Sequence, residues 1–121
     1  MLPAERRVHR REEFTATVRQ GRRVHAPGLV LYLRSDDSGA PARAGFIVAR
    51  PVGPAVRRNR VRRQLRHLIA PYLEHAPAGI AIVIRVTDGA SRLTGAALAD
   101  ALAAALAKAG VSTPAADGEP R

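Results

Sequence analysis

The segment from Pro54 to Tyr72 constrains the fold of this 121-residue chain more than any other part of its sequence. Its apolar residues follow the spacing of one helix face: Val61, Leu65, Leu68, Ile69 and Tyr72. The positions between them are strongly basic, with six Arg between residues 57 and 66. Pro54, which follows Gly53, suits the first helical position because its missing N–H would be unpaired there. The pattern predicts a half-buried helix with a cationic outer surface.

The helical projection separates the polar residues of this segment. Most lie outside the apolar arc: Asn59, Arg63 and Arg66 on one flank, Arg57 on the other, and Arg60 with His67 on the far side. Arg58 projects into the apolar arc, and since an unpaired buried charge is costly, it must lie beyond the core at the first turn. A helix N-terminus favours anions, so Arg58, Asn59 and Arg62 predict a phosphate or carboxylate site there.

An alternative is that these arginines form an ordinary solvated face. Such a face usually includes Glu, because each opposite-charge pair at i+3 or i+4 stabilises a helix by ~0.2–0.5 kcal/mol. Here the whole stretch between Asp37 and Glu74 carries eight Arg and no acidic residue. The arginines therefore repel one another along the helix, which favours a binding role over a solvated face.

The charge of the whole chain indicates the kind of partner. The net charge is +10, and residues 1–75 hold 16 Arg and six acidic residues, whereas residues 76–121 hold four of each sign. Arg supplies 19 of the 20 basic residues, and a guanidinium grips phosphate through two parallel N–H groups. RNA or DNA is the expected ligand. The sequence lacks the zinc-ligand spacing and the heptads of common DNA-reading modules.

Other classes of function have little support in the sequence. There is no Cys, which excludes disulfides, thiol nucleophiles and Cys-ligated zinc. The four His lack metal-ligand spacing, and Asp36-Asp37 lies in a polar turn, so we expect no catalytic side chains on the protein. Neither a signal-peptide core nor an apolar run of ~18 residues is present. We expect a cytoplasmic protein that begins at Met1 and has no membrane partner.

Local patterns predict the elements around the basic helix. They are a helix over Glu12–Gln20, strands over Leu29–Arg34, Ala44–Arg50 and Ile80–Val86, and a helix over Thr94–Ala109. The short loop between the first two strands predicts a hairpin. The third strand is apolar at nearly every position, so we expect it at the centre of the sheet. Pro71 is expected to kink the basic helix or to end it early, near Tyr72 or Leu73.

The order αββαβα gives the fold class. It predicts an α/β (α+β) two-layer sandwich in which helices cover a small, mainly antiparallel sheet, with the basic helix as a crossover between two strands. Residues 1–110 are expected to form a single RNA-binding domain, and residues 111–121 a flexible C-terminal tail.

Several residues in and before the basic helix resemble the signature of the bacterial ribonuclease P protein subunit. They are Gly53, Ala55-Val56, Arg58-Asn59-Arg60, Arg62-Arg63 and Arg66. The order of elements is similar over roughly residues 5–110, including Arg11-Glu12-Glu13-Phe14, Gly21, the Leu29–Leu33 strand and the Phe46–Arg50 strand. This spacing is far more specific than basic charge alone.

The resemblance implies a left-handed crossover and a role in ribonuclease P, the endonuclease that removes the 5′ leader of precursor tRNA. It implies a ribonucleoprotein with one protein per catalytic RNA, in which the RNA carries out the hydrolysis and Mg²⁺ is bound mainly by RNA and substrate. The RNA-binding residues that it implies are Arg50, Arg57, Arg58, Asn59, Arg60, Arg62, Arg63 and Arg66. A cleft for the leader, where unpaired bases stack on aromatic rings, is implied at Phe14, Val18, Tyr32, Arg10 and Arg11.

Three residues depart from the family pattern. Val18 stands where a second aromatic residue is common, which predicts weaker stacking in the cleft, and Pro51 and Pro54 replace a common Lys and a common Asn. Two alternatives stay open. Phe14 and Tyr32 belong to the core if they have no role in binding, and the chain is a general structural RNA-binding protein, such as a ribosome-associated one, if it has no role in tRNA processing.

Overall fold

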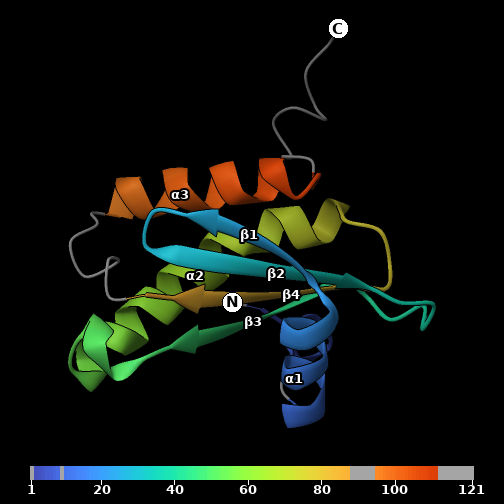
Figure 1. Ribbon diagram of the computed structural model, residues 1–121, viewed down its shortest axis with the longest axis horizontal. Coiled ribbons are helices and arrows are strands. Elements are labelled where there is room, and N and C mark those ends of the chain that lie inside the picture. The colour runs from blue at the N-terminus through green and yellow to red at the C-terminus, as the bar shows by residue number, and fades with distance from the viewer. Residues whose placement is uncertain (1, 9, 88–94, 112–121) are drawn as a thin grey trace, which may run out of the picture.

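The computed structural model describes residues 2–8, 10–87 and 95–111. Within these residues a four-stranded sheet is combined with three α-helices and two short 3₁₀ turns (Figure 1). The elements are η1 (Ala4–Arg6), α1 (Arg11–Gln20), β1 (Arg22–Ala26), β2 (Leu29–Ser35), β3 (Arg43–Val48), η2 (Arg50–Val52), α2 (Ala55–His75), β4 (Ile80–Val86) and α3 (Gly95–Lys108). The predicted fold class, a sheet covered by helices, is confirmed.

The last strand in sequence lies inside the sheet. The strand order is β1-β2-β4-β3, with β4 antiparallel to β2 and parallel to β3. The predicted central position of Ile80–Val86 is therefore confirmed. Because β3 and β4 are parallel neighbours, α2 forms the crossover between them, as predicted. The left-handed sense of this crossover stays a prediction.

The predicted hairpin between the Leu29–Arg34 and Ala44–Arg50 strands is wrong, because β4 inserts between β2 and β3. The tight hairpin instead joins β1 to β2 through Pro27-Gly28, where Gly28 has a φ of 79°. Strand β1 was not predicted from the sequence, because it lies at the edge of the sheet and only its residue Val24 is buried. With β1 included, the element order is αβββαβα instead of αββαβα.

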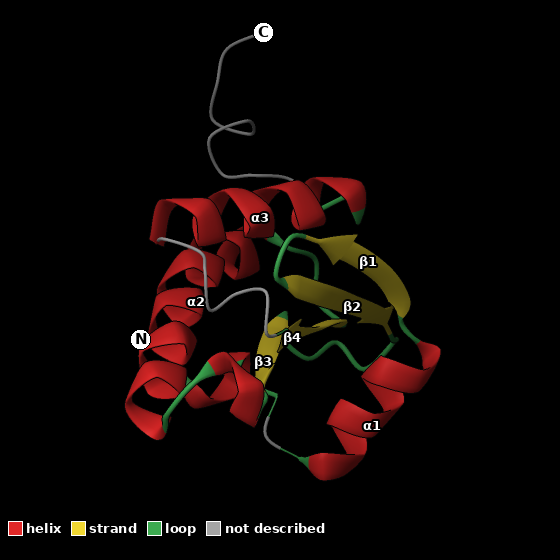
Figure 2. Cartoon of the chain, turned by 60° about the vertical axis from the view of Figure 1, so that its left-hand side comes forward, coloured by secondary structure: helices red, strands yellow, loops and turns green. Residues whose placement is uncertain are grey.

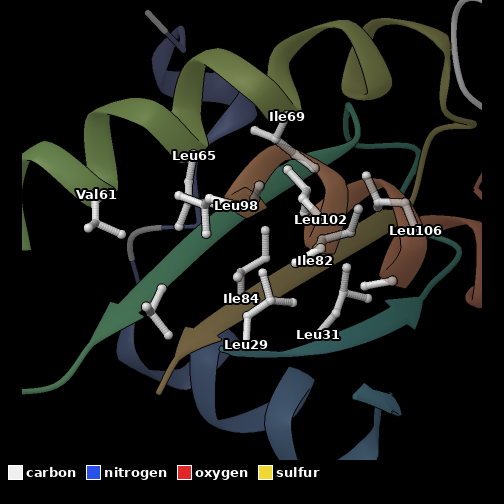
Figure 3. Packing of buried hydrophobic residues seen from close by; sticks show 14 of the residues in the cluster. Leu29, Leu31, Val61, Leu65, Ile69, Ile82, Ile84, Leu98, Leu102 and Leu106 are labelled. Atoms are coloured by element: carbon white, nitrogen blue, oxygen red, sulfur yellow. The ribbon is translucent and has the colours of Figure 1, made fainter. Parts of the chain in front are cut away.

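The core lies between the sheet and the layer formed by α2 and α3 (Figure 3). Its largest contributors are Leu29 and Leu31 of β2, Ile82 and Ile84 of β4, Val61, Leu65, Ile69 and Leu73 of α2, and Leu98, Leu102 and Leu106 of α3. The apolar stripe predicted for the basic helix is thus buried, with Leu68 and Tyr72 half-buried at its margin. This burial fixes which face of α2 is turned to solvent.

Helix α1 packs on the opposite face of the sheet from α2 and α3 (Figure 2). Its Thr17 is fully buried, and the Thr17 hydroxyl donates to the Glu13 carbonyl at 2.8 Å and accepts from Nε of Arg34 at 3.4 Å. Since α1 contacts β2 and β4, it covers only part of this sheet face.

Helix α2 continues through Pro71 to His75, so the early ending predicted near Tyr72 or Leu73 is wrong. Pro71 leaves the carbonyl of His67 without its helical partner, but both residues are exposed and water can take that place. At this end, Nη1 of Arg6 donates to the carbonyls of Leu73 at 2.9 Å and Ala42 at 3.2 Å. The predicted tail lies almost wholly outside the described residues.

Candidate nucleic-acid interface

The start of α2 is shaped by the two residues before it. Gly53 has a φ of 149°, a conformation that favours glycine, and Pro54 is the N-cap instead of the predicted first helical residue. Arg58 lies at the first turn beyond the core, as predicted, and its Nε donates to the Gly53 carbonyl at 3.2 Å. Val56 is 72% exposed beside it. The N-terminal turn thus presents free backbone N–H groups, a guanidinium and an apolar side chain to solvent.

The basic residues of α2 differ in their exposure. Asn59, Arg60 and Arg63 are exposed, whereas Arg57, Arg58, Arg62 and Arg66 are half-buried. Nη1 of Arg62 donates to Oδ1 of Asn59 at 3.1 Å. Within the described ranges, Arg60, Arg63 and Arg66 make no ion pair with a carboxylate. Their charge is therefore available to an anionic ligand.

Phe14 lies between α2 and the part of the sheet face that α1 leaves uncovered. Its ring packs on β3 at Gly45, where an added Cβ would lie 2.5 Å from Cζ of Phe14. On one side the half-buried ring lines a hollow of about 160 Å³ together with Arg62 and Arg66. On the other side it lines a hollow of about 260 Å³ with Thr15, Val18, Arg19 and Ile47. The ring thus lies between the basic flank of α2 and the face of the sheet beside α1. Two predicted cleft residues, Phe14 and Val18, line the same hollow.

Tyr32 is in a different environment. It is only 3% exposed, and the guanidinium carbon of Arg23 lies 5.7 Å from the centre of its ring. This geometry is that of a cation–π contact. In this structure the ring belongs to the packing under α1, so any base stacking on it would require Arg23 and α1 to move.

The other predicted site residues lie at the surface. Arg10 is the N-cap of α1 and Arg11 its first residue, and both are exposed. Arg50 is exposed in η2, between β3 and α2. Arg50 and α2 thus follow one another at one end of the molecule, whereas Arg10 and Arg11 lie at the start of α1.

An ionic network around the buried Arg43 fixes α1 to the sheet. Nε of Arg43 donates to Oε1 of Glu13 at 2.7 Å, and Nη2 of Arg43 donates to Oδ2 of Asp36 at 3.2 Å, which also accepts from Arg34 at 3.3 Å. Burial opposes the charged form of Arg43, but its hydrogen bonds and ion pairs with Glu13 and Asp36 outweigh this and raise its pKa. Because Glu13 precedes Phe14, the network also fixes the position of the aromatic ring.

The same network controls the ionisation of Asp36. The hydroxyl and backbone N–H of Ser38 donate to Oδ1 of Asp36 at 2.5 and 3.0 Å. These hydrogen bonds, with a further contribution from Arg43 and against the effect of burial, lower the pKa of Asp36 to about 2. Asp36 is therefore ionised throughout the neutral range. Its carboxylate stabilises the fold and is not offered to a ligand.

Comparison with known proteins decides the family. The family model described as Ribonuclease P matches residues 2–110. The ribonuclease P protein component of Streptomyces bikiniensis is 46% identical over 114 residues, which cover 88% of this chain and 93% of the relative. The chain belongs to the ribonuclease P protein family. The component from Acidothermus cellulolyticus is 45% identical over 100 residues, covering 82% of this chain and 83% of that protein.

Solved structures of this ribonuclease P family have the same fold. The RNase P protein of Staphylococcus aureus matches with a TM-score of 0.81 and 24% identity, over 88% of this chain and 96% of that one. The protein of Thermotoga maritima matches with a TM-score of 0.72 and 24% identity, over 84% and 96% of the two chains. The basic surface described above is accordingly that of a subunit of ribonuclease P, an enzyme of tRNA processing.

The described residues of this ribonuclease P protein lack both a metal-binding cluster and a membrane-spanning helix. They contain no group of three His, Asp or Glu side chains that could hold a metal ion. The carboxylates of Glu13 and Asp36 are both paired with Arg43. None of the helices in these residues is both long and apolar enough to span a bilayer.

Sequence reasoning missed two groups of residues that shape this surface. Arg7, Val8 and Phe46 line the hollow beside Phe14, because residue 7 forms a bridge with Ala44 at the free edge of β3. Arg85 is exposed on the central strand. A signal for Arg85 exists in the sequence, since it is the only charged residue of the apolar strand Ile80–Val86.

Proposed function

We propose that this protein binds the catalytic RNA of ribonuclease P through α2 and the 5′ leader of precursor tRNA through the hollows beside Phe14. One observation carries the proposal: Arg62 and Arg66 of α2 and Phe14 of α1 line the same hollow. A cationic helix that can bind phosphates therefore lies next to an aromatic ring on which unpaired bases can stack. Guanidinium groups grip phosphate, and single-stranded bases stack on aromatic rings.

The chemical step is assigned to the RNA. The described part of the protein has no metal-ligating cluster, so Mg²⁺ is proposed to be held by the RNA subunit and the substrate. The protein would contribute affinity for the precursor and neutralisation of phosphate repulsion where RNA and leader meet. We propose one protein per catalytic RNA, acting in the bacterial cytoplasm where precursor tRNA is made.

The test is cleavage of precursor tRNA at low Mg²⁺ by the catalytic RNA of the same organism, with and without the protein. We expect the protein to raise the cleavage rate and the affinity for precursor tRNA above that for mature tRNA. A protein that binds RNA but changes neither quantity would instead be a general structural RNA-binding protein.

Phe14→Ala tests the leader hollow within the same assay. It should weaken binding of precursor tRNA roughly three- to tenfold, because one stacked base is lost, and leave binding of mature tRNA unchanged. Gly45→Ala is a second route to the same defect, since the new methyl group displaces the ring from β3. Equal losses for precursor and mature tRNA would mean that Phe14 serves only the packing of α1.

A further inference from the structure

Residues 2–8 form a strap around the free edge of the sheet, where β3 is the last strand. Leu2, near the start of this N-terminal strap, is buried in the core between the sheet and α2. Val8, at its end, is buried on the opposite face of β3, where an added Cβ on Gly45 would lie 2.9 Å from Cβ of Val8 and close to the Phe14 ring. The N-terminal strap therefore passes from the α2 side of the sheet to the α1 side.

One side chain ties the N-terminal strap to α2. Nη1 of Arg6 donates to the carbonyl of Leu73 at 2.9 Å and to that of Ala42 at 3.2 Å. Leu73 lies in the last turn of α2, where carbonyls lack helical partners and the helix dipole favours a cation. Ala42 directly precedes β3. A single guanidinium thus joins the N-terminal strap to the start of β3 and to the end of the basic helix.

The next residue of the N-terminal strap belongs to the basic surface. Arg7 is exposed and lines the hollow of about 160 Å³ together with Arg62 and Arg66 of α2. Among the described residues that line this hollow there is no carboxylate. Three cationic side chains around one hollow repel one another, and an anion in the hollow reverses this effect. The charge of Arg7 reaches such an anion only while the N-terminal strap is closed.

A purely structural role is the simplest alternative for Arg6. Under this alternative, loss of Arg6 lowers the stability of the fold and changes nothing else. The N-terminal strap, however, has few attachments between its two apolar ends, because residues 3–5 and Arg7 are exposed. Removal of the Arg6 hydrogen bonds would therefore loosen the segment that carries Arg7, while α2 and the sheet stay folded.

We propose that Arg6 is a positioning residue for RNA binding. By tying the N-terminal strap to the last turn of α2, it keeps Arg7 beside Arg62 and Arg66, where the three side chains bind a phosphate of the catalytic RNA. This inference rests on the proposed function, since it deepens the contact of α2 with that RNA. Linkage requires the converse effect as well, so RNA bound at the hollow stabilises the closed strap.

A double-mutant cycle tests whether Arg6 acts through Arg7. The measured quantity is the affinity of the protein for the catalytic RNA. We expect Arg6→Ala to weaken binding roughly three- to tenfold and Arg6→Lys to restore most of it, because an ammonium group can donate to the same carbonyls. In an Arg7→Ala background, Arg6→Ala should have no further effect, since the contact is already lost. Losses that add in the double variant would overturn the inference.

Hydrogen exchange gives a readout of the N-terminal strap itself. The Val8 N–H donates to the Ala44 carbonyl at 2.9 Å, so its exchange rate reports local opening. In Arg6→Ala we expect roughly tenfold faster exchange at Val8, with much smaller changes for the amides of β4. Catalytic RNA added to the wild-type protein should slow exchange at Val8. If Arg6→Ala left the Val8 rate unchanged, the strap would not depend on Arg6 and the inference would be wrong.

Arg22→Ala is the matched control. Nη2 of Arg22 donates to the carbonyl of Lys108 at 2.9 Å, so this variant removes the same type of bond from the last turn of α3. Arg22 lies in β1, at the opposite edge of the sheet from β3. We expect the Val8 exchange rate and the RNA affinity to stay close to those of wild type. Thermal unfolding of each variant confirms that it is folded, and Arg6→Gln replaces Arg6→Ala if the latter is not.

The outcomes separate the inference from the proposed function. If Arg58→Ala and Arg63→Ala weaken RNA binding but Arg6→Ala does not, the N-terminal strap has no part in binding and the proposed function stands. An equal loss of affinity with Arg22→Ala also overturns the inference, because general destabilisation would then explain both losses. If none of these variants weakens binding, the proposed contact through α2 fails and this inference fails with it.

Discussion

The arginines of α2 and those around the base of α1 are the same side chain in opposite situations. Arg43 and Arg34 donate to the carboxylates of Glu13 and Asp36, and Arg6 donates to two carbonyls. In the described part of the chain, Arg60, Arg63 and Arg66 have no carboxylate partner. The net charge of +10 counts both groups equally, but only the second offers its charge to a ligand. The difference is therefore between cations that build the fold and cations that the fold presents.

The largest effect should come from the buried group. Arg43→Ala removes the partner of the Glu13 carboxylate and one of the two arginines paired with Asp36, and we expect it to lower the free energy of unfolding by about 3 kcal/mol. Urea unfolding measures this value. Arg63→Ala is the control, and its effect should lie within about 0.5 kcal/mol because the residue is exposed and surrounded by like charge. If both variants lowered the free energy of unfolding by similar amounts, the distinction between structural and solvent-presented arginines would be wrong.

An effect of intermediate size should appear in RNA binding, with the order of the variants reversed. Arg63→Ala should weaken binding to the catalytic RNA several-fold and lower the salt slope by about one unit, because one phosphate contact is lost. Arg58→Ala should do the same at the helix N-terminus. Salt titrations of affinity provide the measurement. An unchanged slope in both variants would mean that neither guanidinium touches phosphate.

The smallest effect concerns the pH dependence of the buried group. The folded pKa of Asp36 is about 2, below its ordinary value of 3.8, so the ionised carboxylate favours the folded state. This contribution is complete well above pH 3.8 and is lost as the pH falls toward 2. Asp36→Asn should flatten the fall in stability across that window, whereas Arg63→Ala should leave its shape unchanged. Unfolding free energies measured at a series of pH values test this, and identical curves for wild type and Asp36→Asn would contradict it.

The sequence predicted those parts of the fold that depend on local pattern. The stripe containing Val61, Leu65 and Ile69 is buried, and the apolar strand Ile80–Val86 is central. The family resemblance is likewise confirmed by the match over residues 2–110. Helix α2 continues past Pro71 because the burial of Leu73 and the hydrogen bond from Arg6 stabilise its last turn. These tertiary contacts outweigh the local tendency of proline to end a helix.

Relations between distant segments could not be predicted. The loop between β2 and β3 looked like a hairpin because nothing in residues 29–50 shows that a strand ending at residue 86 inserts there. Arg43 looked like one more basic residue, since its partner Glu13 lies 30 positions away. Of the predicted site, Phe14 and Val18 meet at one hollow whereas Tyr32 is covered, because strand alternation places a side chain on a face without fixing what packs above it.

The position of β4 has a consequence for synthesis of the protein. Strands β2 and β3 make their shared ladder only through β4, so neither the sheet nor the core beneath α2 can close until residue 86 has left the ribosome. By then the segment that carries the entire excess of positive charge has already emerged. At a synthesis rate of about 5–20 residues per second, seconds pass between the emergence of the basic segment and the closure of the core that fixes its position. Completion of one late strand converts a nonspecific polycation into a surface with fixed geometry.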